Sequence, residues 1–411
     1  MYISKIAGVA ELVYARDSKS RLARDGGSSP LSGTMKNVPL SYIEISKKNL
    51  IHNITQFRRI VRKGTKIAGV VKANAYGHGD VEVVKILNPY VDYFQINSVE
   101  ELEKIRPYTK KPVLLLGYVQ KHDITRAITH GCILSVFDSH HALLINESAR
   151  KIGMKQKVHI ALDAHLGREG ILPSQAGTFL EEIKKMKFIL VDGVYAHFAN
   201  IEDSADLTHA EKQIKAYHEV IEECKKHKIK NIKTHLSATS GVLAYEKWNG
   251  IHSIVRVGMG LYGMWPSERL YHVWKNKINL RLVLRHITHV AQVKMIQKGE
   301  TIGYGLTYTT KKDTMIAVIP QGYSNGIPRS LSNKGQVLIQ GKRVAILGRI
   351  AMNMFVVDVS MLKTVKPEEE VVLLGTQKKE CISPEESALW SDTINYEVTT
   401  RLSPLLPRVV V

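Results

Sequence analysis

The stretch from Ile67 to Ile96, IAGVVKANAYGHGDVEVVKILNPYVDYFQI, sets the pattern for residues 65–265. It begins and ends with short apolar runs, Ile67–Val71 and Tyr93–Ile96, which are typical of buried β-strands. Longer helical patterns separate such runs; in Glu211–His227, for example, apolar residues recur at helical spacing and charged residues cover the other face. This alternation predicts repeated strand–helix units.

Six further strands are expected at Val113–Leu116, Ile133–Val136, Val158–Leu162, Val191–Tyr195, Ile232–His235 and Ile254–Val257. Parallel strands need crossover helices between them. Eight such units within about 200 residues predict a TIM-type (β/α)8 barrel. A doubly wound open sheet is the competing architecture, but its Gly-x-Gly-x-x-Gly turn does not follow the first strand.

The hydrophobic pattern changes after about residue 275, where turns such as Asn333-Lys334-Gly335 separate short apolar runs. This pattern predicts a mostly antiparallel β domain over residues 271–411, following a barrel over residues 35–270. An early strand at Tyr42–Ile45 precedes the barrel and is expected to pair with the C-terminal domain. The C-terminal runs are Leu280–Leu284, Val290–Met295, Ile316–Ile319, Val337–Ile339, Val344–Ile346, Phe355–Val359 and Val371–Leu374.

Residues 1–34 differ from the rest of the chain, because they show no sustained hydrophobic period. They lack the apolar core of a secretory signal, and Glu11, Asp17 and Asp25 argue against a transit peptide. The segment Gly8–Thr34 resembles a translated tRNA gene. We therefore expect residues 1–34 to be a non-native or disordered extension, and the native chain to start at Met35.

The formal net charge of +20 raises the question of nucleic-acid binding. The basic residues are spread along the chain, often beside acids as in Glu181-Glu182-Ile183-Lys184-Lys185, and no nucleic-acid-binding motif is present. A solvated basic surface explains the charge better, so we expect no nucleic-acid partner.

Membrane, metal and disulfide chemistry are not expected either. No run approaches the ~18 apolar residues of a membrane helix. The three cysteines, Cys132, Cys224 and Cys381, are far apart and show neither metal-ligand nor disulfide spacing. Free cysteines favour a reducing compartment, so we expect a cytoplasmic protein without a bound metal.

Polar residues follow several of the expected barrel strands, at the end where barrel enzymes carry their active sites. Lys72 follows the first strand directly, and a buried lysine amine has a lowered pKa and becomes nucleophilic. A lysine that simply reaches solvent at the barrel rim remains an alternative. The other polar residues at this rim are Asp163, Arg168, His197, Thr239, Arg256 and Gly258.

A glycine turn, Gly258-Met259-Gly260, follows the eighth strand. Glycines let backbone N–H groups approach a phosphate closely. Glycine turns are common, but phosphate sites of barrels favour the last strands. The turn is therefore a candidate phosphate site.

Together these motifs resemble those of the alanine racemase family, which depends on pyridoxal phosphate (PLP) and combines a barrel with a C-terminal β domain. Their order and approximate spacing agree from about residue 40 to the end of the chain. The motifs are Val70–Gly79, Asp163 with Gly167-Arg168, Tyr195–Ala199, Val255–Gly258, Gly303–Gly305, Gly322-Tyr323, Gly348–Met352 and Thr393–Glu397.

The resemblance implies a role for each matching residue. Lys72 would bind PLP covalently and act as a base on one face of the substrate α-carbon, and Tyr304 from the partner of a homodimer would be the base on the other face. Arg256 would face the pyridine nitrogen, with His197 against the ring. The phosphate would be bound by Tyr76, Thr239, Gly258, Met259 and Tyr396, and the substrate would contact Arg168, Met352 and Tyr323.

The physical chemistry of racemisation agrees with these roles. A proton must leave one side of the α-carbon and return from the other, which requires two bases. A tyrosine is a poor base at neutral pH unless cations stabilise its phenolate. An arginine stays protonated, so the pyridine nitrogen opposite Arg256 should remain uncharged, which discourages transamination and favours proton exchange.

The chain departs from the family in three single residues and in one pair of neighbouring residues. Ala161 stands where many members have a carbamylated lysine that braces the substrate arginine, so the bracing of Arg168 would need another anion. Asn353 replaces an aspartate, and Glu169 replaces a leucine for reasons that the sequence does not explain. Ala238-Thr239 replaces Asn-Ser, and Thr239 keeps the hydroxyl group.

The resemblance thus implies an enzyme that interconverts L- and D-alanine and supplies D-alanine for peptidoglycan. Two alternatives stay open: a serine or broad-specificity racemase, and a PLP-binding regulatory protein without turnover. Regulatory proteins of that kind lack the β domain with its catalytic tyrosine, so residues 275–411 argue against the second alternative.

Overall fold

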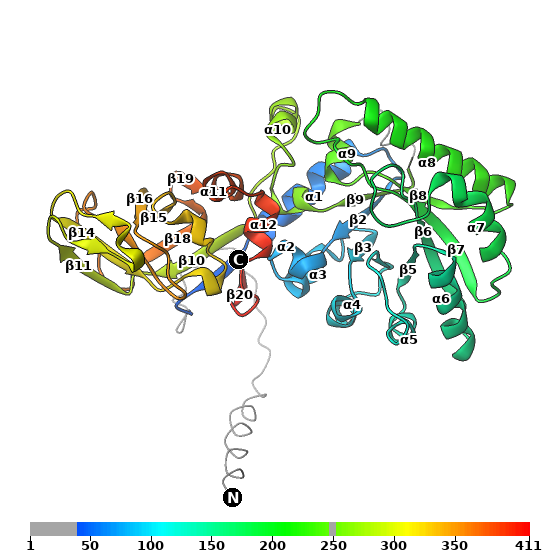
Figure 1. Ribbon diagram of the computed structural model, residues 1–411, viewed down its shortest axis with the longest axis horizontal. Helices are drawn as coiled ribbons and strands as arrows, with labels where there is room; N and C mark the ends of the chain where they lie inside the picture. Colours follow the sequence, from blue (N-terminus) through cyan, green and yellow to red (C-terminus); the bar gives the residue numbers. More distant parts are fainter. Residues whose placement is uncertain (1–38, 246–251) are drawn as a thin grey trace, which may run out of the picture. The chain divides into compact units, whose positions relative to one another are not determined.

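The structure, a computed structural model, describes residues 39–245 and 252–411 (Figure 1). The expected extension 1–34 and the expected start at Met35 lie outside these residues. Within the described residues, no helix has the length and apolar character needed to cross a membrane.

Eight parallel strands form one sheet in the order β8-β7-β6-β5-β4-β3-β2-β9 (Figure 1). The sheet closes where the Arg256 N–H donates to the Ser237 carbonyl at 3.0 Å, beside a parallel bridge between Ala238 and Arg256. The expected barrel is therefore confirmed. The strands are β2 (Lys66–Val70), β3 (Tyr93–Ile96), β4 (Val113–Leu115), β5 (Ile133–Val136), β6 (Gln156–Ala161), β7 (Ile189–Tyr195), β8 (Lys233–His235) and β9 (Ile254–Val257).

Successive residues of a strand face opposite sides of the sheet, so each barrel strand has an inner and an outer face. Helices cover the outer faces. Ile67, Phe94 and Val255 belong to the large core that the strands share with the helices. Ala68, Ala161 and Ile254 belong to a separate inner cluster. The helices are α1 (Lys47–Ile60), α2 (Lys72–Tyr76), α3 (Asp80–Leu87), α4 (Val99–Ile105), α5 (Ile124–Thr129), α6 (Ser139–Lys151), α7 (Ala176–Ile183), α8 (Thr208–Lys226), α9 (Thr239–Ala244) and α10 (Glu268–Trp274).

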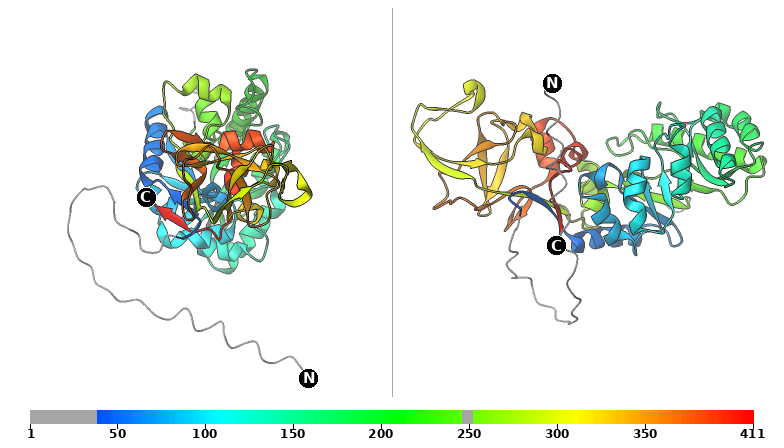
Figure 2. Two further views of the ribbon diagram at one scale, coloured as in Figure 1. Left: turned by 90° about the vertical axis from the view of Figure 1, so that its left-hand side faces the viewer. Right: turned by 90° about the horizontal axis from the view of Figure 1, so that it is seen from below.

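A second, mostly antiparallel sheet has the order β11-β14-β17-β16-β15-β18-β10-β1-β20, with β19 paired to β18. The early strand β1 (Tyr42–Ile45) lies between β10 and β20, so it belongs to this sheet rather than to the barrel, as Figure 2 also shows. The other strands are β10 (Leu284–His289), β11 (Gln292–Ile296), β14 (Thr314–Ile319), β15 (Gln336–Ile339), β16 (Lys342–Leu347), β17 (Phe355–Asp358), β18 (Glu370–Gln377), β19 (Glu380–Ile382) and β20 (Arg408–Val410).

The expected strand Leu280–Leu284 is wrong, because β10 begins only at Leu284. Side chains of helix α1 form hydrogen bonds with the backbone groups of this segment instead. Asn53 Nδ2 donates to the Arg281 carbonyl at 2.7 Å, and Asn49 Nδ2 donates to the Leu282 carbonyl at 2.8 Å. Asparagine side chains of a helix far away in the sequence therefore bind the carbonyls that strand pairing was expected to use.

Several elements of the C-terminal part were not expected from the sequence. Two are short helices, α11 (Pro384–Ser391) and α12 (Asn395–Thr400), which contact each other. A two-stranded hairpin, β12 (Thr301–Ile302) with β13 (Tyr308–Thr309), encloses a short 3-10 turn, η5 (Tyr304–Leu306). Helix α12 and the η5 turn carry two of the expected site residues, Tyr396 and Tyr304.

Candidate active site

The backbone after β2 makes a left-handed turn that holds Lys72 at the carboxyl end of the barrel. Four consecutive residues other than glycine, from Ala73 to Tyr76, have φ values between 53° and 55°. Each such residue costs about 1–2 kcal/mol, and strain of this kind is concentrated at functional sites. Gly77 ends the turn with φ 84°, where a Cβ would lie 1.9 Å from the Thr399 carbonyl of α12. The surrounding structure therefore fixes the backbone at Lys72.

Glu101, on α4, ties this turn to the end of β3. One of its carboxylate oxygens accepts from the Ala73 N–H at 2.6 Å, and the other accepts from the Asn97 N–H at 2.7 Å. Ser98 caps α4 by accepting from the Glu101 N–H at 3.3 Å. The Ser98–Glu101 spacing is the signature of a helix start, but it gives no hint that the carboxylate supports Lys72.

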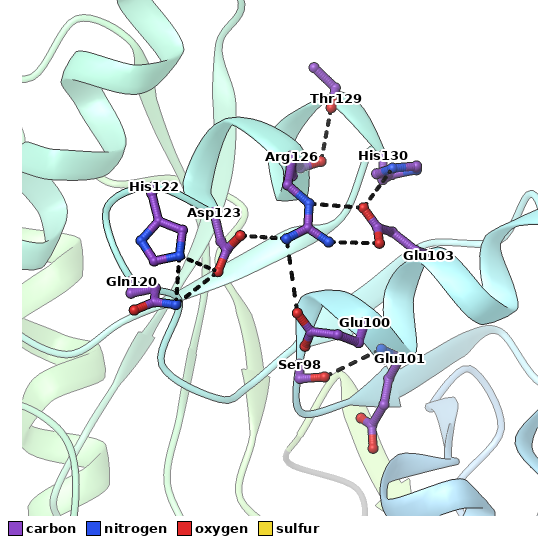
Figure 3. A network of polar contacts seen from close by, with 10 residues as sticks. All are labelled: Ser98, Glu100, Glu101, Glu103, Gln120, His122, Asp123, Arg126, Thr129 and His130. Carbon is purple, nitrogen blue, oxygen red and sulfur yellow. Dashed lines mark hydrogen bonds and ion pairs between the residues drawn. The ribbon is translucent and has the colours of Figure 1, made fainter. Parts of the chain in front are cut away.

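Ion pairs fix α4 on α5 (Figure 3). Arg126 of α5 donates through Nε and Nη2 to the two carboxylate oxygens of Glu103, at 3.0 and 2.7 Å. Arg126 also pairs with Asp123. Exposed pairs add little to stability, but the two-pronged geometry fixes how the helices pack. The network therefore orients the helix that carries Glu101.

Lys72 faces a cavity with a volume of about 500 Å³. Burial lowers the pKa of Lys72; the positive charges of Arg168 and Arg256 lower it further, while Glu101 and Glu169 act in the opposite direction. A lysine in this environment is a better nucleophile and base than a solvated one. The residues around the cavity are Lys72, Asn97, Leu116, Gly117, Tyr118, Phe137, Arg168 and Glu169.

Arg256, on β9, is buried with 1% of its surface exposed. Its Nη1 donates to Nδ1 and to the carbonyl of His235 at 2.6 and 2.8 Å. Its Nη2 donates to the carbonyls of Ala196 and Leu236 at 2.8 and 3.0 Å. Within the described residues the Nε–H has no partner. Burial lowers the pKa of Arg256 to about 10, so the guanidinium stays charged at neutral pH.

His197 lies beside Arg256, whose Nη2 is 3.4 Å from the His197 Nδ1. Burial, the charge of Arg256 and those of Arg168 and Lys72 hold the pKa of His197 well below its ordinary value. The imidazole is therefore neutral, and Nδ1 is free to accept from the guanidinium.

The residues expected to bind the phosphate lie close to one another. The Gly258 N–H donates to Thr239 Oγ1 at 3.0 Å, and a Cβ on Gly258 would lie 2.7 Å from the Tyr76 hydroxyl oxygen. The ring of Tyr396, on α12, is 5.9 Å from that of Tyr76. Burial raises the pKa of both tyrosines, so each keeps a hydroxyl proton to donate. Met259 is buried at the start of the following 3-10 turn.

Arg168 pairs with its neighbour Glu169, with Nη2 to Oε1 at 2.8 Å and a second contact through Nε. The loop that carries both residues folds back on the end of β6, where the Ile171 N–H donates to the Ala161 carbonyl at 2.9 Å. Gly170, with φ 121°, packs directly on that carbonyl. Glu169 is thus an anionic partner for Arg168, whose bracing the sequence left open because Ala161 replaces a lysine.

Tyr304, Tyr323 and Met352 lie in the β domain, with 74, 44 and 55% of their surfaces exposed. The segments carrying the latter two are adjacent, because the Tyr323 N–H donates to the Ala351 carbonyl at 3.1 Å. Asn353 donates to the neighbouring Ser324 hydroxyl at 2.9 Å. Among the described residues, no hydrogen bond or ring contact links Tyr304, Tyr323 or Met352 to Lys72.

Comparison with known proteins agrees with this arrangement. The alanine racemase N-terminal domain matches residues 45–266, and the alanine racemase C-terminal domain matches residues 283–410. The chain belongs to the alanine racemase family. The expected family, fold class and cofactor class of this racemase family member are therefore confirmed.

Named relatives of this racemase family member cover nearly the whole chain. Alanine racemase 1 of Caldanaerobacter subterraneus subsp. tengcongensis is 34% identical over 371 residues, which are 89% of this chain and 94% of the relative. Alanine racemase of Methanococcus maripaludis is 34% identical, with 90% of this chain and 98% of the relative covered. The solved alanine racemase of Clostridium difficile 630 is 29% identical with a TM-score of 0.85, covering 92% of this chain and 97% of that one.

The residues of this alanine racemase family member fit PLP, the cofactor of the family. The hydroxyl groups of Thr239 and Tyr76 lie at Gly258, where the lack of a side chain lets them and the backbone come close together, as a bound phosphate group would need. The Nε–H of Arg256, which has no partner in the part of the chain that the structure describes, is a buried donor that a pyridine nitrogen would satisfy. Lys72 has the amine that would bind the aldehyde carbon of the cofactor.

Proposed function

We propose that the protein interconverts L-alanine and D-alanine with PLP, and that Lys72 and Tyr304 are the bases on opposite faces of the substrate α-carbon. The observation that carries this proposal is the state of Arg256: it is buried and charged, and only its Nε–H lacks a partner among the described residues. PLP withdraws electrons from the α-carbon of a bound amino acid, and it does so less strongly when its ring nitrogen is unprotonated. An arginine at that nitrogen keeps it unprotonated.

Lys72 takes the α-proton on its face because its lowered pKa leaves the amine neutral for part of the time. The strained turn from Ala73 to Tyr76 and the carboxylate of Glu101 fix the backbone from which the Lys72 side chain extends. Arg168, held by Glu169, binds the substrate carboxylate as a charge-assisted pair. Thr239, Gly258, Met259, Tyr76 and Tyr396 bind the phosphate.

We further propose a homodimer in which each subunit contributes Tyr304, Tyr323 and Met352 to the barrel of its partner. These residues support an interface because they are apolar and exposed, and Leu306 next to Tyr304 is also 67% exposed. Exposed apolar groups gathered on one face mark interaction surfaces. Covering Tyr304 by the partner's barrel would bring its hydroxyl group towards the cations Arg168 and Arg256, which stabilise a phenolate.

The cytoplasm is the proposed location, where D-alanine would supply peptidoglycan synthesis. The described cysteines Cys132, Cys224 and Cys381 are free thiols, as in proteins of reducing compartments.

The test is incubation of the purified protein and PLP with L-alanine or L-serine, followed by chiral chromatography. D-alanine formed much faster than D-serine supports the proposal. Equal rates would favour a broad-specificity racemase, and no product from either substrate by the PLP-loaded protein would favour a regulatory role.

A further inference from the structure

A chain of hydrogen bonds runs from Arg256 through the interior of the barrel. His235 Nδ1 lies 2.6 Å from Arg256 Nη1, and His235 Nε2 lies 2.7 Å from His159 Nδ1. His159 Nε2 in turn lies 3.2 Å from Asp192 Oδ2. The three residues behind Arg256 come from β8, β6 and β7, and neither histidine has any exposed surface.

The direction of every hydrogen bond in this chain follows from its two ends. Arg256 can only donate, so His235 Nδ1 accepts and the ring proton of His235 is on Nε2. That proton is donated to His159 Nδ1, which places the ring proton of His159 on Nε2 as well. The carboxylate of Asp192 accepts this last proton. Both imidazoles are therefore neutral and in the Nε2–H form.

The charges around the chain support this protonation state. Burial and the charge of Arg256 hold the pKa of His235 well below its ordinary value, and burial also lowers that of His159. The hydrogen bonds from His159 and Lys233 hold the pKa of Asp192 far below its ordinary value. Lys233 Nζ lies 2.7 Å from Asp192 Oδ2, so the outer end of the chain is an ion pair.

The packing leaves the two rings no freedom to turn over. Gly193 follows Asp192, and a Cβ there would lie 2.7 Å from His159 Nε2, so the backbone of β7 presses on the ring. The ring of His235 stacks on that of Tyr195, with centroids 5.1 Å apart and planes inclined by 15°. A flipped ring would put two acceptors or two donors face to face in a dry interior.

We propose that Asp192, His159 and His235 are positioning residues that hold the guanidinium of Arg256 in one orientation, so that its Nε–H is presented to the cofactor ring nitrogen. This inference rests on the proposed function. The negative charge of Asp192 acts on Arg256 through two polarised neutral rings, in the way that outer partners tune the ligands of a metal. Without this anchor, the guanidinium of Arg256 is less fixed in orientation, so its Nε–H is lost as a donor for part of the time and the ring nitrogen can take up a proton instead.

The first test is ¹⁵N NMR of the full-length holoenzyme with labelled histidines. We expect His159 and His235 to remain in the Nε2–H form from pH 6 to 9. An imidazolium or an Nδ1–H form of either ring would overturn the proposal, whether or not the protein proves to be a racemase. The wild-type spectrum alone gives this result, so it does not depend on a variant that folds.

The second test is Asp192→Asn, with Asp92→Asn as the matched control. Asp92 is also a partly buried carboxylate near the barrel strands, paired with Arg58 at 2.8 Å and Lys66 at 3.3 Å, but it is not part of the chain to Arg256. We expect Asp192→Asn alone to move the Nε2–H proton resonances of His159 and His235 upfield. The proposal would be overturned if the chemical shift of the His235 Nε2–H proton did not change in Asp192→Asn, or changed by the same amount in Asp92→Asn.

The same variants test the consequence for the cofactor. When the amino group of L-alanine is transferred to the cofactor, one pyruvate is released for each pyridoxamine phosphate formed. We expect Asp192→Asn to raise the ratio of pyruvate to D-alanine by roughly tenfold, as for a change of about one pKa unit at the ring nitrogen. An unchanged ratio in Asp192→Asn, with altered histidine resonances, would contradict the link from the chain to the cofactor.

Discussion

Arg168 and Glu169, neighbours in the sequence, form an ion pair at the edge of the cavity that contains Lys72. The loop that carries the pair folds back on the end of β6, where the Ile171 N–H donates to the Ala161 carbonyl at 2.9 Å. The guanidinium that we propose to bind the substrate carboxylate therefore has a local anion to fix its orientation.

Glu169→Gln should raise the KM for L-alanine by up to about fivefold, since partly exposed ion pairs are worth about 1 kcal/mol at most. Steady-state kinetics measure this, with Glu222→Gln as the control, because Glu222 pairs with the exposed Lys225 on α8. An unchanged KM in Glu169→Gln would show that the pair does not position Arg168.

Lys72→Ala should abolish the absorption band of the covalently bound cofactor and lower racemisation by more than about a thousandfold, because the same amine binds PLP and moves the proton. Lys85→Ala is the control, since Lys85 lies over the ring of Tyr108 outside the cavity. A normal absorption band in Lys72→Ala would refute the assignment of the cofactor lysine.

The strand pattern and Lys72 could be predicted from the sequence because both depend on local signals, apolar runs and the residue that follows them. Glu169 and Glu101 could not, since the role of Glu169 depends on a loop that folds back on β6 and that of Glu101 on the packing of α4 against the turn after β2. His159 and His235 look like ordinary residues of buried strands. Only the closed barrel brings them into line with Arg256.

The free energy of unfolding should fall as the pH is lowered from about 6.5 to 4. Burial lowers the pKa of His78 to about 4, so in this range the unfolded chain binds a proton that the folded chain excludes. The loss from this group is up to about 1.4 kcal/mol per pH unit. The ring of His78 stacks on Tyr262, with centroids 4.3 Å apart, so His78→Phe can keep the contact without the titration.

Urea unfolding of the wild type and His78→Phe at several pH values measures this effect. The variant should have a shallower dependence on pH, whereas His272→Gln, at an exposed position, should follow the wild type. Equal slopes for all three proteins would contradict a neutral buried His78.

Tyr304→Phe should stop racemisation but leave proton exchange on one face of the α-carbon. Lys72 can still remove and return the α-proton on its own face. In D2O, NMR should show exchange of the α-proton for only one alanine enantiomer, with the configuration retained. Exchange of both enantiomers at wild-type rates would mean that another group is the second base.

The shared active site is tested most directly by mixing Lys72→Ala with Tyr304→Phe, each inactive alone, under conditions in which subunits exchange. If Tyr304 acts on the partner's barrel, one of the two sites in each mixed dimer contains both bases, and about a quarter of the wild-type activity returns. If Tyr304 serves its own barrel, no site in any dimer is complete. A mixture that stays inactive while the subunits demonstrably exchange would contradict the account.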